Sequence, residues 1–108
     1  MKAKDLRDLV RFSDDAVRTE TLYDEERLWS EVVCLQGNQM LGPLSDPVSE
    51  GIVTVLAGQV AVQVGKNRTR MKQWGSVHVG SGEELTITNA SPEPAVVLVV
   101  LAPPPARS

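Results

Sequence analysis

The fold of this chain is decided by residues 51–73, which read GIVTVLAGQVAVQVGKNRTRMKQ. Residues 51–57 form an almost continuous apolar run rich in β-branched side chains, which is typical of a buried strand. Residues 59–64 alternate, with three valines on one face and Gln, Ala and Gln on the other. This alternation predicts a second strand with one face in the core.

The end of the same stretch predicts a hairpin and a basic return strand. Residues 65–67 are Gly-Lys-Asn, a turn sequence in which Gly and Asn tolerate positive φ. Residues 68–73 then place like charges on one face, which must see solvent: Arg68, Arg70 and Lys72. With Lys66 these side chains would attract an anion, but we favour an edge strand protected by charge.

Short valine-rich runs between glycines continue on both sides of this stretch. All eight glycines lie at position 37 or later, and such punctuation is typical of an all-β sandwich or barrel. The further strands that we expect are residues 17–23, 29–36, 75–79, 84–89 and 95–102.

The first 26 residues differ from the rest. Leu6, Leu9 and Val10 have helical spacing and predict a short amphipathic helix that packs on the barrel or on a partner. We expect residues 1–26 to hold this helix and an edge strand, 27–102 to form the barrel, and 103–108 to form a proline-rich tail.

Composition excludes several classes of function. The net charge of −3 and few aromatic residues argue against a nucleic-acid partner. The longest apolar stretch, 95–102, is far too short to span a membrane as a helix. The charged N-terminus does not resemble a secretory signal, so we expect a cytoplasmic protein. The single Cys34, within an apolar run, is expected to be buried and inert.

Two short motifs resemble those of the cupin family. Residues 53–59, Val-Thr-Val-Leu-Ala-Gly-Gln, look like the hairpin that follows the first cupin motif. Residues 75–82, Gly-Ser-Val-His-Val-Gly-Ser-Gly, with Asn89 beyond them, look like the second motif. The resemblance implies a cupin-type jelly-roll β-barrel. It also implies a homodimer, in which the apolar strand 95–102 would be buried by pairing.

The metal-binding positions of that family are where this sequence departs from it. The family pattern takes two His from the first motif, then a Glu, then a third His from the second motif. Here the resemblance places Leu44 and Asp46 at the first two positions and Leu85 at the last. The Glu position falls on Gly51 or on Glu50, depending on the direction of the count. We therefore expect no metal and no cofactor.

His78 is the only histidine and stands at none of those positions. It alternates with Val77 and Val79 and so points to the opposite face from them. We favour a surface or hydrogen-bonded histidine over a pocket acid or base, and over a metal ligand.

The remaining candidates each have two interpretations. Asp46 and Glu50 would bind a hard cation or share a proton, although a solvated loop is the simpler interpretation. Glu31 lines the cavity if Trp29 and Val33 face the core, and otherwise lies on the surface. Met40 is a pocket wall or a packing residue.

These observations lead to a function hypothesis and two alternatives. The resemblance suggests a metal-free module that binds a small molecule in the barrel. The alternatives are a cupin-type isomerase or oxygenase with an unusual site, and a structural or regulatory dimer. We lean against an enzyme. The candidate pocket residues are Glu31, Met40, Leu44, Asp46, Glu50, His78 and Leu85.

Overall fold

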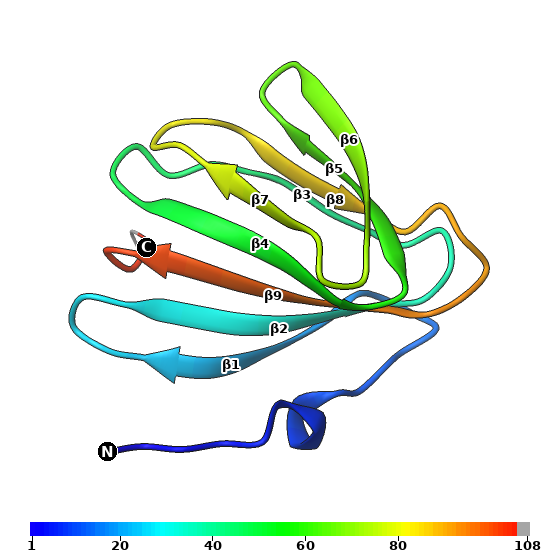
Figure 1. Cartoon of the computed structure of the whole chain (residues 1–108), viewed down its shortest axis with the longest axis horizontal. Coiled ribbons are helices and arrows are strands. Elements are labelled where there is room, and N and C mark those ends of the chain that lie inside the picture. The colour runs from blue at the N-terminus through cyan, green and yellow to red at the C-terminus, as the bar shows by residue number, and fades with distance from the viewer. Residues whose placement is uncertain (106–108) are drawn as a thin grey trace.

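The computed structural model describes residues 1–105 and shows an all-β sandwich (Figure 1). One sheet has five strands in the order β1-β2-β9-β4-β7, and the other has four in the order β3-β8-β5-β6. All neighbouring strands are antiparallel. The strands are β1 (Arg18–Asp24), β2 (Trp29–Leu35), β3 (Met40–Leu44), β4 (Glu50–Ala57), β5 (Gln59–Val64), β6 (Asn67–Lys72), β7 (Ser76–Val79), β8 (Leu85–Thr88) and β9 (Ala95–Ala102). The expected all-β class is confirmed.

The core lies between the two sheets and is built mainly from the alternating valines. On β5, Val60, Val62 and Val64 are buried in it, as their spacing predicts. Figure 1 shows β4 leading directly into the β5–β6 hairpin, so the chain crosses from one sheet to the other at this point. The stretch 51–73 therefore links the two layers of the sandwich.

The N-terminal segment covers part of the outer face of the five-stranded sheet. Val32, Cys34 and Val96 face outward and are packed by apolar residues of the segment: Leu6, Leu9, Val10 and Phe12. The expected helix is only a 3-10 helix, η1 (Leu6–Leu9), capped by the Asp5 side chain. Four residues with one polar cap cannot sustain an α-helix, and the apolar residues pack without one.

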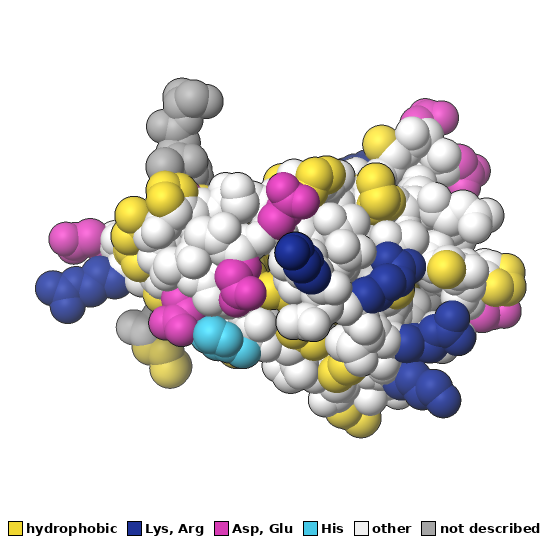
Figure 2. Space-filling model, turned by 90° about the horizontal axis from the view of Figure 1, so that it is seen from above, with side chains coloured by type: hydrophobic (Ala, Val, Ile, Leu, Met, Phe, Trp, Pro, Cys, Tyr) yellow, Lys and Arg dark blue, Asp and Glu magenta, His cyan; other side chains and the backbone are white. Residues whose placement is uncertain are grey.

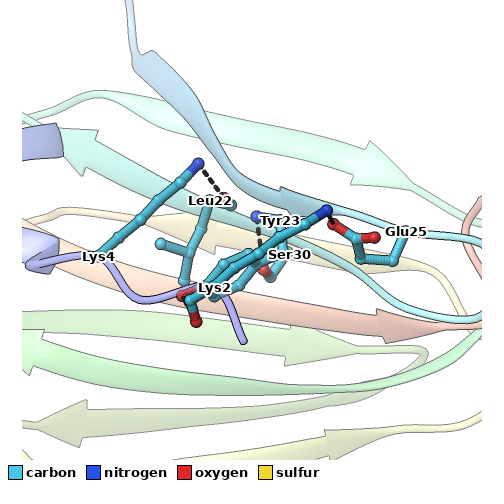
Figure 3. Close-up of polar contacts among 6 residues, drawn as sticks. All are labelled: Lys2, Lys4, Leu22, Tyr23, Glu25 and Ser30. Carbon is cyan, nitrogen blue, oxygen red and sulfur yellow. Dashed lines mark hydrogen bonds and ion pairs between the residues drawn. The ribbon is translucent and has the colours of Figure 1, made fainter.

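Polar contacts fasten the same segment to β1 and the turn after it (Figure 3). The Lys2 ammonium pairs with Glu25, and the Lys4 ammonium donates to the Leu22 carbonyl at 2.7 Å. Lys4 also lies over the Tyr23 ring, 5.3 Å from its centre. The segment therefore shields this part of the outer face and keeps Cys34 buried.

Two features differ from expectation. β3 was not predicted, because Gly42 and Pro43 interrupt its apolar pattern and its pairing with β8 shifts register there. β9 does not need a second copy to bury it, since it is hydrogen-bonded on both edges, to β2 and β4. The homodimer itself stays a prediction. Residues 106–108 of the expected tail lie outside the described residues.

No helix within residues 1–105 is long and apolar enough to cross a membrane. The basic strand β6 lies at one edge of the four-stranded sheet, with its charged side chains exposed.

Candidate functional site

A cavity of about 400 Å³ lies between the two sheets at one end of the sandwich. This is the end at which Figure 1 shows the β3–β4 and β7–β8 loops and the C-terminus, on the left of the view. Its walls are mainly apolar side chains from both sheets: Trp29, Leu41, Leu44, Val79, Leu85, Val99 and Leu101. Cavities of this size and character commonly hold small molecules in proteins.

Glu31 enters this cavity because of the alternation along β2. Trp29 and Val33 face the opposite sheet, while Ser30 and Val32 face outward. Glu31 is in phase with Trp29 and lines the same cavity. Of the two interpretations that the sequence leaves open, the structure shows the inward one.

The carboxyl group of Glu31 is poorly solvated. Burial raises its pKa from the usual 4.5 to about 7, because water is removed from around the charged form. Within residues 1–105 the carboxylate has no hydrogen-bond or ion-pair partner. It is a half-ionised group at neutral pH in a mainly apolar cavity.

The rim of the cavity is organised by hydrogen bonds between loops. The Asp46 Oδ1 atom accepts bonds from the backbone N–H groups of Val48 and Ser49, at 2.9 and 2.8 Å. Glu83 Oε1 accepts from the Gly80 N–H at 2.8 Å. Ser49 Oγ donates to the Pro103 carbonyl at 2.7 Å and so attaches the C-terminal segment. The mouth is therefore held in shape before any ligand arrives.

The positions that hold metal ligands in cupins do not fit a metal here. Leu44 and Leu85 are register partners on β3 and β8, and both present apolar side chains to the cavity. A Cβ atom at Gly51 would lie 2.5 Å from the backbone carbonyl oxygen of Val100, so no carboxylate fits at that position. Glu50 binds His78 on the outer surface instead. No group of three or more His, Cys, Asp or Glu in the described chain could hold a metal ion.

Four of the seven sequence candidates line the cavity, and three lie elsewhere. The cavity brings together Glu31, Leu44, Asp46 and Leu85. The Met40 side chain is exposed at the start of β3. The Glu50 and His78 side chains are each 61% exposed and meet in a contact of 2.6 Å between His78 Nε2 and Glu50 Oε2 on the outer face of β4 and β7. Their strand positions direct them outward, because Val77 and Val79 take the inward ones.

Figure 2 shows the single histidine on the surface beside acidic side chains. The structure thus places His78 outside the cavity and does not bring Asp46 and Glu50 together. Asp46 points to the rim, while Glu50 points away from it.

Several cavity residues were not singled out from the sequence. Val99 and Leu101 alternate inward along β9, and this alternation is the signal that could have identified them. Ser49, Gly80 and Glu83 come from loops, and no pattern in the chain marks them as neighbours. Their place at the rim depends on the pairing of β4 with β7.

The comparisons with known proteins agree with this architecture. Among solved structures, the TT1209 protein of Thermus thermophilus is 27% identical, with a TM-score of 0.92 over 97% of this chain and 100% of that chain. An RmlC-like cupin protein from Desulfovibrio desulfuricans is 22% identical, with a TM-score of 0.86 over 96% and 98%. An uncharacterized conserved protein with a double-stranded β-helix domain from Klebsiella pneumoniae is 18% identical, with a TM-score of 0.88 over 100% and 99%.

The two less similar structures show the fold alone. A comparison with the curated proteins finds no match. The model of the cupin domain family matches residues 31–101, which is more than half of the chain and includes both resembling motifs. Together with the two-sheet barrel and its retained Asn89, this match shows that the chain belongs to the cupin domain family.

Proposed function

We propose that this chain is a binding module for a small, mostly apolar molecule, which lies in the cavity between the two sheets. The observation that carries the proposal is the cavity of about 400 Å³, walled by leucines at two of the family's metal positions. These leucines replace metal ligands with apolar surface. They favour a ligand bound through its shape and apolar area.

The partly exposed apolar walls give such a ligand a driving force. Trp29, Leu41 and Leu101 are only partly buried by the protein itself. Covering apolar surface gains about 25 cal/mol per Å², so a ligand that fills the space would bury what the fold leaves open. The preformed rim lowers the cost of ordering the loops on binding.

An enzyme is the second candidate, and Glu31 is the observation that favours it. A carboxyl with a pKa of about 7 suits a general acid or base at neutral pH. However, the other two carboxyls of the cavity, Asp46 and Glu83, are engaged in holding the rim. We therefore rank a cupin-type isomerase or oxygenase below the binding module.

Tryptophan fluorescence tests the proposal directly. Trp29 lines the cavity, whereas Trp74 is 74% exposed outside it, so a Trp74→Phe variant leaves Trp29 as the only indole reporter. In this background we expect members of a library of small apolar molecules to change the Trp29 emission in a saturable way. A further Leu44→Trp substitution would occupy the cavity, and calorimetry should then show that the same molecules no longer bind.

The opposite results would remove the proposal. It fails if no molecule of the library binds, or if binding is unchanged when the cavity is filled. Metal analysis of protein purified without a histidine tag gives an independent check. One transition-metal ion per chain would contradict the inference drawn from Leu44 and Leu85.

A further inference from the structure

The cavity has a one-sided distribution of charge. Its described lining includes the carboxyl groups of Glu31, Asp46 and Glu83, but no Lys, Arg or His. Carboxylates grouped around a low-dielectric space create a negative potential that attracts cations and repels anions. The apolar walls alone do not distinguish a cationic ligand from an anionic one, so the carboxyl groups narrow the choice of ligand.

The three carboxyl groups are not equivalent. Asp46 and Glu83 belong to the rim loops, and each accepts hydrogen bonds from the backbone. Glu31 lies on β2, which is hydrogen-bonded on both edges. Its register partners are Thr21 on β1 and Val99 on β9. Its backbone is therefore rigidly placed, while within residues 1–105 its carboxylate has no partner.

Within residues 1–105, no lining residue carries a positive charge that would compensate Glu31. The residues that β1 and β9 contribute to the cavity are Thr19, Val99 and Leu101, and β3 and β8 contribute only leucines. The other charged residues in the described part of the lining are Asp46 and Glu83 of the rim, which have the same sign as Glu31. An ionised carboxylate in such surroundings is unfavourable until a cation reaches it.

We infer that the ligand of this cavity is a small hydrophobic amine, whose ammonium group binds the Glu31 carboxylate and whose apolar body packs against Trp29, Leu44 and Leu101. The inference rests on the proposed function and names the ligand class of the same cavity. A neutral molecule of the same shape would gain only the apolar contacts. An acid of that shape would place a second negative charge beside Glu31.

Binding of an amine is then coupled to pH. The pKa of Glu31 is about 7 in the free protein, so the carboxylate is mainly protonated at pH 6 and mainly ionised at pH 8. Only the ionised form pairs with ammonium. The amine therefore binds about tenfold more tightly at pH 8 than at pH 6, and complex formation near neutral pH releases a proton.

The test uses three probes of equal length, hexylamine, hexanol and hexanoate, with the Trp74→Phe protein. Affinities are measured from Trp29 emission and by calorimetry at pH 6 and pH 8. Glu31→Gln removes the charge with little change in size. Glu50→Gln is the matched control, because Glu50 lies outside the cavity on the outer surface. Circular dichroism establishes that each variant is folded.

We expect hexylamine to bind at least tenfold more tightly than hexanol at pH 8, and hexanoate to bind most weakly. Glu31→Gln should bring the amine to the level of the alcohol and abolish the pH dependence, whereas Glu50→Gln should change neither. Calorimetry in buffers of different ionisation enthalpy detects the released proton in the unmutated cavity and needs no Glu31 variant.

The outcomes separate this inference from the proposed function. If hexanol and hexylamine bind equally well and the cavity-filling Leu44→Trp abolishes both, the charge inference is wrong and the binding module stands. If hexanoate binds best, the inference is also overturned. If none of the three binds and the apolar library is silent too, both proposals fall together.

Discussion

Each end of the sandwich has a polar side chain that enters from a strand or its end, Asn89 at one and Glu31 at the other, and the two differ in their hydrogen bonding. At the end with the β8–β9 loop, Asn89 is fully buried. Its amide donates to the carbonyls of Leu35 and Glu93, at 3.0 and 2.7 Å, and its Oδ1 accepts from the Ser91 N–H. At the other end, Glu31 lies in a cavity and has no partner in the described chain.

This contrast separates a structural polar group from one available to a ligand. The buried Asn89 amide already uses its N–H donors and its oxygen within the protein, so it serves the fold and not a ligand. A buried carboxyl group without a partner lowers the stability of the fold. A ligand that supplies the partner removes this cost. The predictions below test whether the two ends differ in this way.

The largest expected difference comes from removing one apolar side chain of the closed core and one of the cavity wall. Ile87 is fully buried, and Ile87→Ala should lower the free energy of unfolding by about 4 kcal/mol through lost contacts and a new cavity. Leu44 is 47% exposed beside an existing cavity, so Leu44→Ala should cost less than about 1 kcal/mol. Urea unfolding measures both free energies. Equal losses for the two variants would contradict an open cavity beside Leu44.

A second large effect is expected at the end of the sandwich that contains Asn89. Asn89→Ala leaves two carbonyls and one N–H without their partner and should lower the free energy of unfolding by about 3 kcal/mol. Chemical denaturation is the measurement, and Asn67→Ala on the exposed β6 is the control, expected within about 0.5 kcal/mol. Loss of ligand binding by folded Asn89→Ala protein would show that the two ends are not independent.

A smaller effect is expected at the end with the cavity, where the pKa of Glu31 is raised. Between pH 4.5 and 7 the carboxyl of Glu31 is ionised in the unfolded chain but protonated in the folded one. The unfolded state therefore binds fewer protons there, and stability falls as pH rises through this window. Allowing for partial solvation, the loss is on the order of 1–2 kcal/mol and is complete above pH 7.

The Glu31→Gln protein should lack this decline. Thermal or urea unfolding at pH 5 and pH 8 gives the difference between the two proteins, which isolates the Glu31 contribution from other titrating groups. A decline of the same size in both proteins would mean that Glu31 is well solvated or paired.

The strands were predictable where one pattern dominates. Residues 59–64 alternate with only one buried face, and residues 95–102 are apolar throughout because β9 is the central strand of its sheet. β3 was not predicted because Gly42 and Pro43 interrupt its apolar pattern. The strand forms through its pairing with β8, which a local pattern does not show.

The candidate site was predictable only in part. β2 carries apolar residues on both faces, since Val32 and Cys34 are covered by the N-terminal segment while Val33 and Leu35 enter the core. When both faces of a strand are apolar, the alternation of residues does not show which face points into the core. The sequence therefore could not decide whether Glu31 points into the cavity or to the surface. The rim residues come together only through long-range strand pairing, which no local pattern encodes.

The smallest effect is expected for the polar pair outside both ends, His78 and Glu50. Both side chains are mostly exposed, so water competes for their 2.6 Å contact and their charges are screened. His78→Ala should change the free energy of unfolding by no more than about 0.5 kcal/mol at neutral pH. It should also leave the affinity of the cavity for hexylamine unchanged, because the imidazole lies on the opposite face of the sheet. A loss of affinity with stability intact would mean that the outer surface contributes to the site, and that the negative potential inside the barrel does not act alone in selecting the ligand.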